Sequence, residues 1–136
     1  MKDKVFIDTN VLIYLYSEDE LQKRESSKNV FEKYNCITST QTLNELSNVL
    51  IKKFKVNPTD VLKAIDEVCL NCDVVEVSVG TVKKALQLLE RYGYSYYDSL
   101  IVSAALENEC KFLITEDMHD GQSIENSLTI KNVFVM

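Results

Sequence analysis

Short apolar runs alternate with longer stretches of helical period along this chain, and that alternation constrains the fold more than any other feature. Runs of three or four apolar residues are typical of buried strands, whereas apolar residues recurring every three or four positions indicate amphipathic helices. Strands are expected at residues 5–7, 36–38, 74–77, 111–114 and 130–135. Strands separated by helices predict a mainly parallel sheet covered on both faces, which is a three-layer α/β/α fold.

Helices are expected at residues 18–34, 40–54, 58–70, 78–92 and 98–109. The second of these carries Leu43, Leu46 and Leu50 on one stripe, which is the pattern of a helix that buries one face. Pro58 fits the first turn of the third helix, and Gly93 fits a C-terminal cap after the fourth. Because no repeat, linker or low-complexity segment interrupts the 136 residues, a single domain over residues 1–136 is expected.

The apolar share of 46% and the charged share of 26% are those of an ordinary globular protein. No apolar run approaches the roughly 18 residues of a membrane-spanning helix, and the run after Lys4 is too short for a secretory signal. The chain is therefore expected in the cytoplasm, where its four cysteines would be free thiols. Cys69 and Cys72 have the spacing of half a zinc knuckle, but the sequence has no second such pair.

The net charge of −6 is unfavourable for a protein that binds nucleic acid, because phosphates attract lysine and arginine. Two interpretations stay open: either the partner is not a polyanion, or bound cations neutralise many of the 21 acids. Lys52, Lys53 and Lys55 could contact phosphates, as could Lys83, Lys84 and Arg91, although lysines on solvated helix faces are common. The positions of the acids discriminate between the two interpretations.

Acidic residues lie where a parallel sheet places its ligands. Asp8 follows the first expected strand and Asp117 follows the fourth, while Asp98 begins the helix that leads into the fourth strand. Glu45 lies in the helix after the second strand. Ligands of such sheets bind beyond the carboxyl ends of the strands, where the strand order reverses. If the first and fourth strands are neighbours, these acids are expected to converge.

Converging carboxylates suit a hard divalent cation such as Mg²⁺ or Mn²⁺, which prefers oxygen ligands. Such ions activate water and stabilise the leaving oxygen when a phosphodiester is hydrolysed. Because the chain has a single histidine, His119, it is poorly supplied for a Ser-His-Asp triad or a multi-histidine zinc site.

Each acid also has a simpler interpretation. Asp8 and Asp98 could do no more than cap helices, where their type is favoured. Glu45 lies off the leucine stripe and could be an ordinary solvated residue, and Asp117 could belong to a turn. The joint pattern, and no single acid, favours a metal site.

Four ordered segments resemble the acidic motifs of a known family: FIDTNVL from position 6, LNE from 43, YYDSLIV from 96 and LITED from 113. The family is that of PIN domains, and the resemblance is closest to the VapC-type toxins of bacterial toxin–antitoxin pairs. It implies a five-stranded parallel sheet in the order 3-2-1-4-5 and Mg²⁺- or Mn²⁺-dependent cleavage of RNA. It also implies homodimerisation and inhibition by a cognate antitoxin.

The resemblance makes Asp8, Glu45, Asp98 and Asp117 the acids of the metal site. It makes Thr9 and Thr115 hydroxyl partners that orient those acids. The chain departs from the family pattern at Asp120, before Gly121, where many relatives carry a histidine. Asp120 is therefore either a fifth acid at the rim of the site or a turn residue.

Other interpretations compete with a PIN-type nuclease. A haloacid-dehalogenase-like phosphatase also begins with a strand ending in Asp, but it needs a second Asp where this chain has Asn10. A response-regulator receiver would have a lysine after a late strand, whereas the residues after the fourth strand are acidic. The alternative that remains is a catalytically silent PIN domain that serves as a protein- or RNA-binding assembly module. Intact acids argue against it, because an idle acidic cluster costs stability.

Overall fold

The computed structural model describes residues 1–135, in which one sheet has the strand order β3-β2-β1-β4-β6-β5. The strands are β1 (Lys4–Ile7), β2 (Asn35–Ser39), β3 (Asp73–Val75), β4 (Phe112–Ile114), β5 (Ser123–Ile124) and β6 (Leu128–Lys131). The five predicted strands are all present and parallel, and their order 3-2-1-4-5 is confirmed, with β6 as the fifth. Strand order reverses between β1 and β4, which are neighbours.

The predicted count of five strands was wrong, because a sixth short strand, β5, pairs antiparallel with β6 at the sheet edge. Glu125 and Asn126 form the connection with positive φ angles of 52° and 57°. Hairpin turns of this kind are usually recognised by a glycine, and a two-residue strand has no apolar periodicity to detect. The last parallel strand is also shifted, since it ends at Lys131 and not at residue 135.

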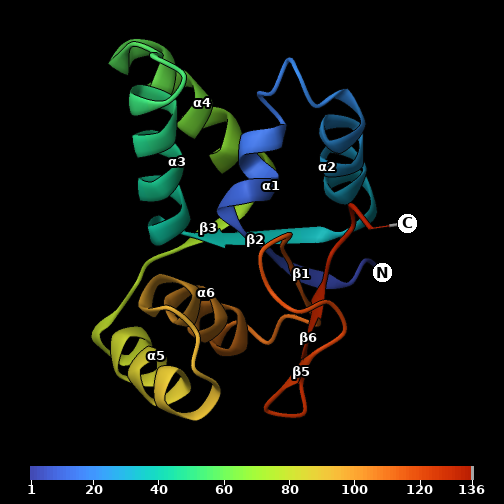
Figure 1. Cartoon of the computed structure of the whole chain (residues 1–136), viewed down its shortest axis with the longest axis vertical. Helices are drawn as coiled ribbons and strands as arrows, with labels where there is room; N and C mark the ends of the chain where they lie inside the picture. The colour runs from blue at the N-terminus through green and yellow to red at the C-terminus, as the bar shows by residue number, and fades with distance from the viewer. Residues whose placement is uncertain (136) are drawn as a thin grey trace.

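Helices cover both faces of the sheet, which confirms the three-layer α/β/α class (Figure 1). One face carries α1 (Thr9–Tyr14), α2 (Leu21–Lys33), α3 (Thr40–Lys52) and α4 (Pro58–Asn71). The other face carries α5 (Val79–Tyr92) and α6 (Tyr96–Glu107). Alternate residues of β1 enter the two cores: Val5 and Ile7 pack in the α1–α4 core, and Phe6 packs in the α5–α6 core.

Caps define the helices that lead to the site. Ser78 forms a capping box at the start of α5, and Gly93 ends α5 in the left-handed conformation with φ 75°. At the start of α3 the Ser39 N–H donates to the Thr42 hydroxyl at 3.1 Å. The six-residue helix α1 was not predicted, because it is too short to show a period. The helix expected to begin at Asp98 begins two residues earlier, since Ser95 is its N-cap.

The cysteines are all free: Cys36, Cys72 and Cys110 are buried, and Cys69 is exposed. Burial raises the pKa of each of the three buried thiols to about 12, so they are unreactive. Among residues 1–135, none of the helices has the length and apolar character needed to cross a membrane.

Candidate metal centre

Asp8 lies at the carboxyl end of β1, where the chain turns into α1. Its N–H donates to the carbonyl of Ile114 at 3.1 Å, so the pairing of β1 with β4 continues one residue beyond the strand. The carboxylate accepts two hydrogen bonds of 2.7 Å, from the Thr9 N–H at Oδ1 and from the Thr115 hydroxyl at Oδ2. Only 4% of Asp8 is exposed. The register that places Ile7 opposite Ile114 therefore brings Asp8 beside Thr115.

Burial raises the pKa of Asp8 from 3.8 to about 7. Hydrogen bonds from Thr115 and Thr9 act in the opposite direction, because they stabilise the carboxylate. The negative charges of Asp98 and Glu45 raise the pKa further. Asp8 thus lies within electrostatic reach of two of the other three predicted acids.

Glu45 is half-buried in the middle of α3, and its Oε2 accepts a 2.7 Å hydrogen bond from the Thr9 hydroxyl. Thr9 bridges two acids, since its N–H binds Asp8 while its hydroxyl binds Glu45. An ordinary solvated helix residue would have neither the partial burial nor this partner. Helix α3 packs on α1, and this contact brings Glu45 to Thr9.

Asp98 is half-buried in the first turn of α6, where its N–H donates to the Ser95 hydroxyl at 3.2 Å. Ser95 therefore caps the helix, and the carboxylate of Asp98 is not needed for that role. Partial burial and the charge of Asp117 raise the pKa of Asp98, while the hydrogen bond with Ser95 lowers it. The Ser95-x-x-Asp98 spacing is an N-cap pattern, so this helix start is encoded in the local sequence.

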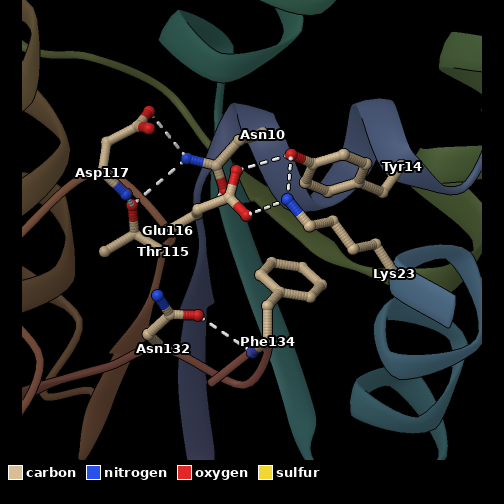
Figure 2. A network of polar contacts seen from close by, with 8 residues as sticks. All are labelled: Asn10, Tyr14, Lys23, Thr115, Glu116, Asp117, Asn132 and Phe134. Atoms are coloured by element: carbon tan, nitrogen blue, oxygen red, sulfur yellow. Dashed lines mark hydrogen bonds and ion pairs between the residues drawn. The ribbon is translucent and has the colours of Figure 1, made fainter. Parts of the chain in front are cut away.

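Asp117 is exposed in the loop after β4, and Asn10 holds it (Figure 2). The Asn10 amide donates to Asp117 Oδ2 at 2.9 Å and to the Thr115 hydroxyl at 3.3 Å. The same amide lies 3.5 Å from Asp8 Oδ2, and the Asp117 N–H donates to the Thr115 hydroxyl at 3.2 Å. Asn10 and Thr115 thus join the ends of β1 and β4. Asn10 was not among the predicted site residues.

Two neighbouring acids have other contacts. The Asp120 carboxylate accepts a 2.8 Å hydrogen bond from the Asn132 N–H, so its observed contact is with the loop after β6. Glu116 was not predicted to take part in the site, yet its N–H donates to Asn10 Oδ1 at 3.3 Å. Its side chain binds Lys23 and Tyr14, which come from α2 and α1 (Figure 2).

The model of the PIN-domain family matches residues 5–119, which include Asp8, Glu45, Asp98 and Asp117. The chain belongs to the PIN-domain family. No curated protein sequence matches it.

Solved PIN-domain structures share this fold at low sequence identity. A toxin–antitoxin complex from Klebsiella pneumoniae is 20% identical with a TM-score of 0.73, over 97% of this chain and 99% of that chain. DNA-bound VapBC from Salmonella typhimurium is 20% identical with a TM-score of 0.70, over 96% and 98%. VapC20 from Mycobacterium tuberculosis, a toxin that cleaves the sarcin–ricin loop, is 16% identical with a TM-score of 0.66, over 80% and 86%. These likenesses establish the fold.

The donor chemistry of this PIN domain fits a hard divalent cation. The four predicted acids supply only carboxylate oxygens, and none of them is in an ion pair among residues 1–135. Within the same residues, no group of three or more acids, histidines or cysteines lies close enough together to form a preformed metal site. The observed couplings are pairwise, from Asp8 to Asp98 and Glu45 and from Asp98 to Asp117. Carboxylates repel one another when no cation lies between them, and this repulsion favours acids that are coupled in pairs over a closer group of three or more.

Proposed function

We propose that this PIN domain is a Mg²⁺- or Mn²⁺-dependent endoribonuclease whose metal is held by Asp8, Glu45, Asp98 and Asp117. The observation that carries the proposal is Asp8, a buried carboxylate that faces other acids and has no lysine or arginine partner within residues 1–135. A buried charge without a counter-charge is costly, and a divalent cation would neutralise it. When bound, such a cation supplies an activated water for hydrolysis of the phosphodiester.

The chain's own residues prepare the site for that chemistry. Thr115 and Thr9 fix the orientation of the Asp8 carboxylate, and Thr9 also fixes Glu45. Asn10 fixes Asp117. Asp8 must lose its proton before it can act as a ligand, because metals bind the carboxylate form. This requirement links metal affinity to pH near neutrality.

The candidate path for an RNA strand is a hollow of about 390 Å³ that begins at Asn10, the residue that binds Asp117. Tyr14, Lys53 and the exposed Phe54 line it, together with the acidic Asp19 and Glu20. An accessible aromatic ring can stack on an unpaired base, and a lysine can contact a phosphate. Lys84 and Arg91 bind Glu125 instead, so Lys53 is the better candidate for a phosphate contact.

The proposed biological role is that of the toxin in a toxin–antitoxin pair, acting on RNA in the cytoplasm and restrained by a cognate antitoxin. Solved structures with this fold include toxin–antitoxin and VapBC complexes and a toxin that cleaves the sarcin–ricin loop, which supports this role. A hollow of about 540 Å³ between α2 and α4 is a candidate surface for such a partner. It is lined by apolar residues such as Leu15, Phe31 and Val68 and by the charged residues Arg24, Lys28, Glu32 and Glu67.

Cleavage of RNA is the direct test. With Mg²⁺ or Mn²⁺, the protein is expected to cut single-stranded or loop-containing RNA, where the backbone is accessible, and EDTA should stop the reaction. Gel analysis of a pool of structured RNAs would measure this, with the Asp98→Asn variant as the matched control. Cleavage that persists in EDTA would refute metal dependence. Absence of both metal binding and cleavage would favour the assembly module.

A homodimer is the expected assembly. Leu62 and Leu70 on α4 are 61% and 87% exposed, and a second copy could cover them. Ile65, on the same helix, packs partly against the core instead. Light scattering should give twice the chain mass, and Leu62→Lys should shift it toward the monomer. A monomer mass for the unmodified protein at high concentration would refute this expectation.

A further inference from the structure

Glu116 lies in the loop that follows β4, and its side chain is bound by Tyr14 of α1 and Lys23 of α2 (Figure 2). Lys23 Nζ lies 2.6 Å from Glu116 Oε2, and the Tyr14 hydroxyl donates to Glu116 Oε1. Lys23 also donates to the Tyr14 hydroxyl at 3.1 Å, so the three groups close a triangle. We name these three residues, Glu116, Lys23 and Tyr14, the Glu116 clamp.

The clamp is a firm contact and not a loose surface ion pair. The side chains of Lys23 and Glu116 are only 33% and 26% exposed. The Tyr14 ring packs edge-on against Phe134 at 5.1 Å between centroids, and Lys23 Nζ lies 4.8 Å from the Tyr14 ring centre. Packing of this kind restricts the side-chain rotamers, so the pair loses less entropy on forming than an exposed pair would.

The clamp is connected to the metal-site acids through Asn10. Glu116 directly precedes Asp117, and its N–H donates to Asn10 Oδ1 at 3.3 Å. The other end of the Asn10 amide donates to Asp117 Oδ2 at 2.9 Å. The loop is therefore fastened twice to α1, by the Glu116 side chain at Tyr14 and by the backbone at Asn10.

We propose that Glu116 is a positioning residue, which the Lys23 and Tyr14 side chains hold so that Asp117 and Asn10 are fixed for metal binding. This inference rests on the proposed function, because it concerns the affinity of the same site. Asp117 is exposed and lies in a loop, so without a restraint its carboxylate would lose much conformational freedom on binding a metal. The clamp lowers that cost by ordering the loop beforehand.

Lys23 separates positioning from a simple effect of charge. Removing the positive charge of Lys23 should strengthen cation binding if only the electrostatic potential matters. It should weaken binding if Lys23 acts by holding Glu116. Loss of Glu116 weakens cation binding whether Glu116 acts by its charge or by positioning the loop. Only the Lys23 variant therefore discriminates between the two explanations.

The experiment is a calorimetric titration of Mn²⁺ into the whole chain and its variants, without RNA. Lys23→Met and Glu116→Gln are each expected to weaken Mn²⁺ binding about tenfold, and the double variant no more than either alone. Tyr14→Phe, which removes one hydroxyl and keeps the packed ring, should give a smaller loss in the same direction. Melting in EDTA should show that these variants remain folded.

Glu125→Gln is the matched control. Glu125 accepts from Lys84 at 3.2 Å and from Arg91 at 2.7 Å, and its side chain is 25% exposed. The Glu125→Gln variant therefore loses ion pairs of comparable exposure that lie outside the clamp. Its Mn²⁺ affinity is expected to remain that of the unmodified protein. Unchanged or tighter binding by Lys23→Met would overturn the inference alone, as would an equal loss in Glu125→Gln. An unmodified protein that binds no Mn²⁺ would overturn the proposed function as well.

Discussion

The Asp98→Asn variant is expected to lose RNA cleavage by more than roughly a hundredfold while its metal-free form becomes more stable than the unmodified protein. Partial burial and the charge of Asp117 raise the pKa of Asp98, so the ionised carboxylate destabilises the folded state. An amide of the same shape removes that charge. The cap should survive the substitution, because Ser95 accepts from the backbone N–H of residue 98, which the substitution keeps.

The sign of the stability change follows from the direction of the pKa shift. An acid whose pKa is raised on folding binds more protons in the folded state, so its contribution to stability falls as pH rises above its unfolded pKa. The neutral amide imitates the protonated acid at every pH. Mg²⁺ should stabilise the unmodified protein by mass action and should do little for Asp98→Asn.

Thermal melts of both proteins, in EDTA and in Mg²⁺, measure these effects. Ser95→Ala is the matched control, because it removes the cap and keeps the carboxylate. It should lose about 1 kcal/mol of stability and retain its response to Mg²⁺. If Asp98→Asn melts well below the metal-free protein and Mg²⁺ shifts neither of them, Asp98 is a structural residue and the proposed site loses its centre.

The positions of the acids followed from sequence because local pattern and topology determine them. Asp8 and Asp117 come directly after apolar strands, and parallel neighbours bring the carboxyl ends of those strands together. The antiparallel strand β5 escaped prediction because it has two residues and a turn built by Glu125 and Asn126. Regular patterns need several residues to be recognised, and β5 does not provide them.

The residues that hold the acids could not be derived in the same way. Asn10 contacts Asp117 across 107 positions of the chain, and Lys23 contacts Glu116 across 93. No hydrophobic period or motif spacing encodes such a contact, because it depends on how α1 and α2 pack against the carboxyl ends of the strands. The Ser95 cap is different, because it contacts a residue only three positions away and its sequence pattern can be recognised without knowledge of the fold.

The stability of the metal-free protein is expected to fall steeply as pH rises from about 4 to about 7, because burial raises the pKa of Asp8 from 3.8 to about 7. In this window the unfolded chain has released the Asp8 proton and the folded chain still holds it, so each rise in pH favours unfolding. A pKa raised from 3.8 to about 7 corresponds to roughly 4 kcal/mol in the free energy of unfolding. Domains have total stabilities of only about 5 to 15 kcal/mol, so one carboxylate accounts for much of the pH dependence.

Urea unfolding in EDTA between pH 4.5 and 8 would measure this decline, and Asp8→Asn should make it shallower, leaving the part that Asp98 causes. Asp3→Asn is the matched control, because Asp3 is an exposed acid that pairs with Lys111, and this variant should keep the slope. Mn²⁺ should counteract the decline, since the cation binds the carboxylate and its affinity rises as the Asp8 proton is lost. The free energy that Mn²⁺ adds should therefore grow up to about pH 7 and then level off. If Asp8→Asn shows the same slope as the unmodified protein, other groups cause the decline, and Asp8 is not the buried acid that a cation must neutralise.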